Sequence, residues 1–287
     1  MIAMTTLSNT LIDTDTALKE FCQHLSTAEW LSVDTEFLRT DTFYPKLCLI
    51  QIATADKIAC VDAIALTNLQ PLFKALNTEQ PKIFHSASQD LEIFYYLAKF
   101  IPQPLFDTQI LANIAGLGQQ LSYANLTQKL LNITLDKSQT RTNWEKRPLS
   151  LAQHHYACND VRYLYPLYQK LAQQIQTSEQ QQQQADAHTK LCNSKQYQVI
   201  PELAWKRIRA IHKLPQSQKV LAKSLAKWRE NEAKQKNRPR RWILSDKALL
   251  SLATLENTAM SSLVNNGKIS HKMLTRYGEQ WQKLLNE

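Results

Sequence analysis

Apolar residues follow two different spacings along the first part of the chain. Short continuous apolar runs are typical of buried strands, whereas apolar residues that return every three or four positions predict helices. The runs that predict strands cover residues 30–37, 47–53, 58–61, 82–84 and 105–107. The helical spacing covers residues 15–25, 68–76, 90–100, 123–131, 151–156 and 161–176, and a further helix begins at Thr108. Strands that come early and alternate with helices predict an α/β domain with a mixed sheet.

The pattern changes near residues 180–184, a run of five glutamines. This run fits either an exposed helix surface or a flexible linker, and its composition does not decide between the two. Beyond the run, amphipathic helices are predicted at residues 205–212, 220–236 and 246–255. No strand is predicted in this part, so we expect a first domain at residues 1–192 and a small helical bundle at residues 193–287.

The net charge of +9 is concentrated in the second domain. Residues 1–192 hold 15 Lys+Arg against 18 Asp+Glu, a net charge of −3, whereas residues 193–287 hold 19 against 7, a net charge of +12. Such a division is expected where one domain holds a polyanion on which the other acts, although a solvated helical surface has the same composition. The candidate phosphate contacts are Arg207, Arg209, Lys223, Lys227, Arg238, Arg240 and Arg241. Trp242 follows them, and a core position is the favoured interpretation for it over stacking on a base.

The five cysteines are scattered and include no Cys-x-x-Cys pair. An odd, dispersed set predicts reduced thiols in a cytosol, rather than a disulfide framework or a zinc site. The chain does not start with basic residues followed by an apolar stretch, so no signal peptide is expected. No apolar run approaches the ~18 residues of a membrane helix. We therefore expect a cytoplasmic protein that does not bind a membrane.

Asp34 and Glu36 carry the most informative chemistry. They lie in the predicted strand at residues 30–37, where residues i and i+2 point to the same face. Two adjacent carboxylates repel each other unless a positive charge lies between them, and a divalent cation is the usual partner. The polar face of an edge strand is the alternative interpretation, and the pair alone slightly favours it.

Further polar residues lie at the boundaries of predicted elements. Asp90 follows a short apolar strand near the start of a helix, where it could also be a helix cap. Tyr156 and Asp160 are spaced i, i+4 and share one helix face, although Tyr156 could lie in the core and Asp160 in an ion pair. Asp107 is the weakest candidate, because a helix N-cap is its favoured interpretation. The combination of these residues favours a shared site.

In this order, Asp34-Thr35-Glu36, Asp90 and Tyr156 with Asp160 resemble the DEDDy group of 3′→5′ exonucleases, and the ribonuclease D family in particular. The resemblance extends to residues 45–53, 105–109, 135–138, 144, 147–150 and 168. Residues 197–279 resemble a single HRDC domain, whereas the family often has two. The resemblance implies a ribonuclease H-like (DnaQ-like) domain, with a mixed sheet flanked by helices, followed by an all-α HRDC bundle.

The resemblance also implies hydrolysis of RNA from its 3′ end, with release of nucleoside 5′-monophosphates. The implied substrates are tRNA precursors and structured RNA with 3′ extensions, and no obligate protein partner is implied. Two Mg²⁺ or Mn²⁺ ions would be held by the carboxylates of Asp34, Glu36, Asp90 and Asp160. Tyr156 would orient the attacking water. A DNA-directed 3′→5′ exonuclease of the same group and a catalytically silent RNA-binding adaptor are the alternatives.

Six further residues are candidates for contacts with the substrate. The main chain of Thr35 and the His85 side chain could contact the terminal nucleotide. Phe37 could stack on the terminal base, or it could pack in the core. Phosphate contacts or surface salt bridges are expected for Lys137, Arg141 and Arg147.

Overall fold

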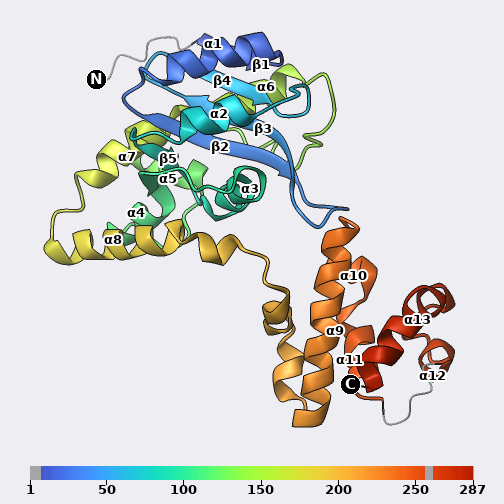
Figure 1. The fold of residues 1–287 in the computed structure, drawn as a ribbon. Coiled ribbons are helices and arrows are strands. Elements are labelled where there is room, and N and C mark those ends of the chain that lie inside the picture. The colour runs from blue at the N-terminus through green and yellow to red at the C-terminus, as the bar shows by residue number, and fades with distance from the viewer. Residues whose placement is uncertain (1–7, 256–260, 287) are drawn as a thin grey trace. The chain divides into compact units, whose positions relative to one another are not determined.

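The computed structural model describes residues 8–255 and 261–286 (Figure 1). The chain divides into two compact units, of which the first comprises Met1–Leu38 and Pro45–Tyr197, and the second Arg39–Tyr44 and Gln198–Glu287. The sequence placed the boundary after residue 192 and did not assign Arg39–Tyr44 to the second unit. The signal-peptide expectation rests on the start of the chain, and residues 1–7 lie outside the described residues. Residues 256–260 of the HRDC-like region also lie outside them.

A mixed sheet forms the centre of the first unit, as predicted, and it has six strands where the apolar runs indicated five (Figure 1). Its strands are β1 (Ser8–Ile12), β2 (Leu31–Leu38), β3 (Lys46–Ala53), β4 (Lys57–Asp62), β5 (Lys82–Phe84) and β6 (Leu105–Asp107). The spatial order is β1-β4-β3-β2-β5-β6, with β2, β3 and β4 antiparallel and the other neighbours parallel. The pattern of apolar residues did not predict β1, because its first three residues are Ser, Asn and Thr.

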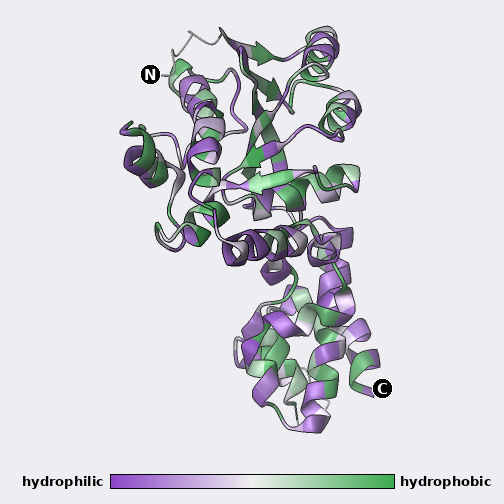
Figure 2. Cartoon of the chain, turned by 90° about the vertical axis from the view of Figure 1, so that its left-hand side faces the viewer, coloured by the Kyte–Doolittle hydropathy of each residue, from purple (hydrophilic) through white to green (hydrophobic). Residues whose placement is uncertain are grey.

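Helices cover both faces of this sheet. The helices of the first unit are α1 (Asp15–Leu25), α2 (Gln70–Leu76), α3 (Ser88–Ala98), α4 (Thr108–Ile114), α5 (Tyr123–Leu131), α6 (Leu151–Arg162), α7 (Leu164–Ala172) and α8 (Ser178–Cys192), with the 3₁₀ segment η1 (Ser194–Tyr197). Side chains of α1, α2 and α3 pack with Val33 and Ile50 in one core, whereas α6 packs with Cys48 and Leu49 in another. Figure 2 shows that these helices carry both hydrophobic and hydrophilic residues, as expected for helices with one side on the sheet and the other in solvent.

The glutamine run at residues 180–184 lies in α8, so it is a helix surface rather than a linker. The helix begins with a capping box in which the Thr177 side chain accepts from Gln180 N–H and the Gln180 side chain accepts from Thr177 N–H. No residue of α8 is buried, which explains why the apolar pattern did not predict this helix.

The described part of the second unit is helical, as predicted. It contains the 3₁₀ segments η2 (Pro201–Arg207) and η3 (Arg209–Lys213) and the helices α9 (Gln216–Gln235), α10 (Arg240–Ile243), α11 (Asp246–Ala253), α12 (Ser261–Asn265) and α13 (His271–Asn286). The prediction of one amphipathic α-helix at residues 205–212 is wrong. Trp205, Ile208 and Ile211 are three residues apart, which matches the period of a 3₁₀ helix.

The core of the second unit is built around Trp281, which is fully buried. Trp228 packs edge-on against it, with ring centroids 5.7 Å apart. Phe43 belongs to this core although it comes from the loop between β2 and β3, and its N–H donates to Asn237 Oδ1 at 3.1 Å. Among residues 8–255 and 261–286, no helix has the length and apolar character needed to cross a membrane.

Candidate active site

Strand β2 carries the acidic pair, Asp34 and Glu36. Val33 faces the core under α1–α3, so Asp34 and Glu36 point to the other face, where α6 lies. Strand β5 pairs with β2 only at Leu31 and Ser32, and the acidic residues therefore lie beyond the end of β5. The register with β3 shifts between Glu36 and Phe37, and such bulges redirect side chains next to functional sites.

Helix α6 brings Tyr156 and Asp160 to this face. It begins with a capping box formed by Ser150 and Gln153, which fixes where its first turn starts. At its other end, the Tyr123 hydroxyl donates to Asn159 O at 2.8 Å and accepts from Tyr163 N–H at 3.1 Å. Tyr123 thus holds the turn that contains Asp160. The sequence placed Tyr123 only on a helix, and no pattern in it indicates this role.

The structure brings three of the four predicted carboxylates together. Oxygen atoms of Asp34, Glu36 and Asp160 lie within 4.8 Å of one another. All three keep part of their surface exposed, so the cluster is open to a ligand from solvent. This pair is therefore not simply the polar face of an edge strand, because it faces an acidic residue from α6.

Asp90 completes the acidic set from the start of α3. The Thr35 hydroxyl donates a short hydrogen bond to Asp90 Oδ1, which ties the carboxylate to β2. The turn before α3 is held by Asp107, whose carboxylate accepts from Ser86 N–H at 3.0 Å and Ala87 N–H at 2.8 Å. Asp107 also accepts from Gln109 N–H and is the N-cap of α4, as predicted.

Loss of solvation raises the pKa values of all four carboxylates, and repulsion between the carboxylates adds to this at Glu36 and Asp34. Loss of solvation raises the pKa of Asp90 and of Asp160 to about 7. Loss of solvation and then the charges of Asp160 and Asp90 raise the pKa of Glu36 to about 9. The pKa of Asp34 is raised well above its usual value by loss of solvation and by the other three carboxylates. Oxygen ligands with this excess of negative charge fit hard divalent cations such as Mg²⁺ and Mn²⁺.

Tyr156 is a neutral hydrogen-bond donor in this environment. Loss of solvation and the charge of Asp160 raise the pKa of its hydroxyl, so it does not ionise near neutral pH. A hydrogen bond from this hydroxyl lowers the pKa of Asp160. The hydroxyl also lies 3.3 Å from Thr140 Oγ1. The i, i+4 spacing therefore joins a donor and an acidic ligand on one helix face.

Two of the predicted substrate contacts have other partners in the structure. His85 Nδ1 lies 2.9 Å from Thr108 Oγ1, and its Nε2 lies 3.0 Å from Leu121 O, so both ring nitrogens are engaged. Phe37 is partly buried against the core under α1–α3. Lys137 and Arg141 are exposed in the segment before α6, and their phosphate contacts stay predictions.

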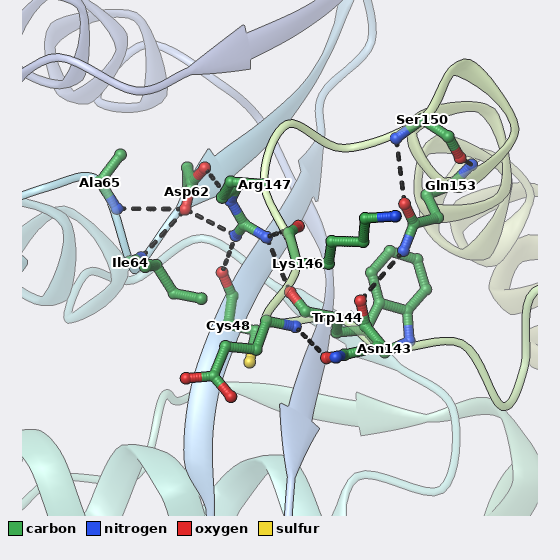
Figure 3. A network of polar contacts seen from close by, with 11 residues as sticks. Cys48, Asp62, Ile64, Ala65, Asn143, Trp144, Lys146, Arg147, Ser150 and Gln153 are labelled. Atoms are coloured by element: carbon green, nitrogen blue, oxygen red, sulfur yellow. Dashed lines mark hydrogen bonds and ion pairs between the residues drawn. The ribbon is translucent and has the colours of Figure 1, made fainter.

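Arg147 has a structural role instead of the predicted phosphate contact (Figure 3). A guanidinium group has five N–H donors, and here all five are used. Two of them form a bidentate pair with Asp62, with Nη2 2.7 Å from Oδ1. The others donate to the carbonyl oxygens of Cys48, Trp144 and Lys146. Arg147 therefore fixes the segment that leads into α6 against β3 and β4.

A cluster of cysteine and histidine lies between α6 and β4. Cys60 Sγ and Cys158 Sγ are 3.6 Å apart, and His154 Nε2 is 3.9 Å from Cys158 Sγ. The sequence showed these cysteines as scattered, because β4 and α6 are far apart along the chain. All five cysteines are free thiols in the structure.

Comparisons with known proteins agree with this geometry. The profile of a family described as 3′-5′ exonuclease matches residues 9–176, and that of the HRDC domain matches residues 218–285. Ribonuclease D of Jannaschia sp. is 38% identical over 263 residues, which are 90% of this chain and 68% of that protein. Ribonuclease D of Bartonella henselae is 39% identical over 245 residues, which are 85% of this chain and 60% of that protein. The chain thus spans about 60–68% of the length of these relatives.

Two solved structures have the same fold. The crystal structure of Escherichia coli RNase D, described as an exoribonuclease involved in structured RNA processing, superposes with a TM-score of 0.88 at 31% identity. The match covers 98% of this chain and 75% of that one. The catalytic core of RRP6 from Trypanosoma brucei, at 20% identity and a TM-score of 0.72, shares the fold.

We expect Arg147→Ala to destabilise the protein by about 3–5 kcal/mol, because the nearly buried Asp62 carboxylate loses its cation. Lys46→Ala is the matched control. It removes an exposed ion pair with Glu145 and is expected to cost only about 0–1 kcal/mol. Urea unfolding of the full chain measures both. Equal, small losses would contradict the structural role and return Arg147 to the candidates for phosphate binding.

We also expect the metal-free protein to lose stability as pH rises from the ordinary pKa of a carboxyl group, about 4, to about 9. The folded-state pKa values of Asp90, Asp160 and Glu36 lie above their ordinary values, so the folded state binds more protons in this window. Stability from such groups is present at low pH and is lost as pH rises through about 7 and about 9. Thermal unfolding in EDTA measures this, with Asp160→Asn as the comparison. An equal pH slope in Asp160→Asn would contradict the raised pKa of Asp160.

Proposed function

This chain belongs to the ribonuclease D family, and we propose that it is a 3′→5′ exoribonuclease. The observation that carries the proposal is the acidic cluster, in which oxygens of Asp34, Glu36 and Asp160 lie within 4.8 Å of one another. Asp90 lies next to this cluster and Tyr156 shares its helix face with Asp160. The reaction is hydrolysis of the terminal phosphodiester, with release of a nucleoside 5′-monophosphate.

The four carboxylates would hold two divalent cations, Mg²⁺ or Mn²⁺. Such ions, when bound, supply an activated water and stabilise the charge that develops on the leaving 3′ oxygen. The protein's part is to fix its ligands before the substrate arrives. Thr35 holds Asp90 from β2, and Tyr123 holds the turn of α6 around Asp160. Ligands that need no rearrangement make this stabilisation available at the moment of reaction.

Tyr156 positions the attacking water rather than removing its proton. A phenol whose pKa is raised stays protonated, so it donates a hydrogen bond but does not act as a base. Its hydroxyl is held between Thr140 and Asp160. Lys137 and Arg141, on the exposed segment before α6, are proposed to contact phosphates of the strand.

We propose RNA 3′ ends, including those of tRNA precursors, as the substrate and the basic second unit as its anchor. The net charge of +12 after residue 192 supports attachment through phosphates, which gives affinity with little sequence preference. The free thiols are compatible with a cytoplasmic location. A DNA-directed exonuclease and a silent RNA-binding adaptor are the alternatives that the following experiment separates.

We expect the full chain to shorten a 5′-labelled tRNA with a short 3′ extension one nucleotide at a time in the presence of Mg²⁺ or Mn²⁺. EDTA should stop the reaction, and Asp34→Asn, which removes one carboxylate charge, should lower the rate by at least about 100-fold. A gel at single-nucleotide resolution measures both, with a DNA strand of the same sequence alongside. Faster digestion of the DNA would favour the DNA-directed enzyme. Intact RNA under all conditions would favour the adaptor.

We expect Tyr156→Phe to lose most of its turnover, by about 10²–10⁴-fold, while substrate binding changes little. The variant removes only the hydroxyl that orients water and keeps the ring beside Trp144. Single-turnover rates and RNA affinity, measured separately, distinguish the two effects. A variant with wild-type turnover would mean that Tyr156 has no part in orienting the water.

A further inference from the structure

The second unit contains a pocket that the proposed catalytic reaction does not use. Its volume is about 310 Å³, and it lies between the end of α9, α10 and the first half of α13. Four cations and two aromatic rings line it, namely Lys236, Arg238, Lys272, Arg276, Trp242 and Tyr277. Only Arg238 of these cations belongs to the phosphate contacts that the sequence indicated.

Four of the six other cations that the sequence indicated form ion pairs inside the second unit. Arg240 and Arg207 both pair with the buried carboxylate of Glu230. Lys227 pairs with Glu202 at 3.0 Å, and Arg241 pairs with Asp246 at 3.4 Å. The net charge of the unit therefore does not by itself locate a surface that attracts phosphate.

The pocket keeps positive charge that is not neutralised in this way. Lys236 pairs with Glu232, and Arg238 lies 3.7 Å from Asp41. Within the part of the chain that the structure describes, no carboxylate forms an ion pair with Lys272 or Arg276. These two residues are spaced i, i+4 on α13, where like charges destabilise a helix. An anion bound between them would relieve this repulsion.

Trp242 supplies a flat apolar surface at the same place. The sequence favoured a core position for it, but 61% of its surface is exposed. The reason is that Ile243 and Leu244, its neighbours along the chain, fill the core in its place. The guanidinium of Arg238 lies 5.8 Å from the centre of the indole ring. An exposed ring beside free cations is how proteins bind single-stranded nucleic acid, because every base can stack.

We propose that this pocket binds one nucleotide of single-stranded RNA. The base stacks on Trp242, and a phosphate next to it is held by Lys272 and Arg276. Tyr277 forms the floor, where its hydroxyl accepts from Lys236 Nζ at 2.9 Å. The choice of RNA rests on the proposed function, and binding through stacking and phosphate predicts little sequence preference.

The test uses the full chain, a fluorescein-labelled oligoadenylate in EDTA, and fluorescence anisotropy over a range of salt concentrations. Trp242→Ala should weaken binding roughly 5- to 150-fold without changing the salt slope, and Trp242→Phe should retain most of the affinity. Lys272→Gln/Arg276→Gln should reduce the slope of log K against log salt by about 0.7, because the two cations hold one phosphate. Lys213→Gln/Lys247→Gln removes two exposed charges that do not line the pocket, and its slope should match the wild type. Circular dichroism confirms that each variant is folded.

Wild-type affinity in Trp242→Ala would overturn the proposal. Equal slope changes in the two double variants would also overturn it, because they would mean that the RNA is attracted by the positive charge of the whole surface and not by this pocket. Displacement of the RNA by an oligoglutamate of equal charge, as effectively as by unlabelled RNA, would overturn it too. Metal-dependent hydrolysis is measured in parallel with the wild type. If hydrolysis occurs and the pocket variants bind normally, only the pocket is wrong. If the pocket variants bind weakly and the wild type hydrolyses nothing, only the catalytic proposal is wrong.

Discussion

Repulsion between four poorly solvated carboxylates is the constraint on which the rest of the first unit depends. Without a counterion, loss of solvation and mutual repulsion raise the pKa values of Asp34 and Glu36, which favours their protonated forms. Keeping such groups together requires a scaffold that cannot relax away from them. The sheet fixes Asp34 and Glu36, and the remaining two carboxylates arrive on separate helices.

The positioning contacts around the cluster follow from that requirement. Asp107 holds the turn that starts α3, and Tyr123 holds the end of α6. Arg147 fastens the segment before α6 to β3 and β4 (Figure 3). Each of these polar side chains has several hydrogen-bond partners, as poorly solvated polar groups require. The acidic cluster is therefore held by residues that do not belong to it.

The parts of this arrangement that depend on local pattern could be predicted from the sequence. The bounds of α1, β5 and α5 agree with the apolar spacing, and the acidic residues were found from their order along the chain. Contacts between distant segments could not be predicted in this way. The pairing of Arg147 with Asp62 joins residues 85 positions apart, and nothing local distinguishes this arginine from one that binds phosphate. Phe43 likewise belongs to the core of the second unit through a loop between two strands.

The second unit shows why net charge is a poor guide to a binding surface. Its positive charge is large, but buried carboxylates such as Glu230 neutralise part of it and use it to hold the fold together. What can meet a polyanion is the remaining charge, and its position depends on which helices meet. The net charge can be counted from the sequence. Only the structure shows which cations form ion pairs inside the unit and which line its surface without such a pair.

The most direct test of this account is calorimetric titration of the full chain with Mn²⁺ near pH 7, in two buffers with different enthalpies of ionisation. Carboxylates with raised pKa values must release protons when they bind a metal, so the observed heat should differ between the buffers. Asp34→Asn should weaken the binding and reduce this difference. Identical heats in the two buffers, with unchanged binding by Asp34→Asn, would contradict the assignment of the acidic cluster as the metal centre.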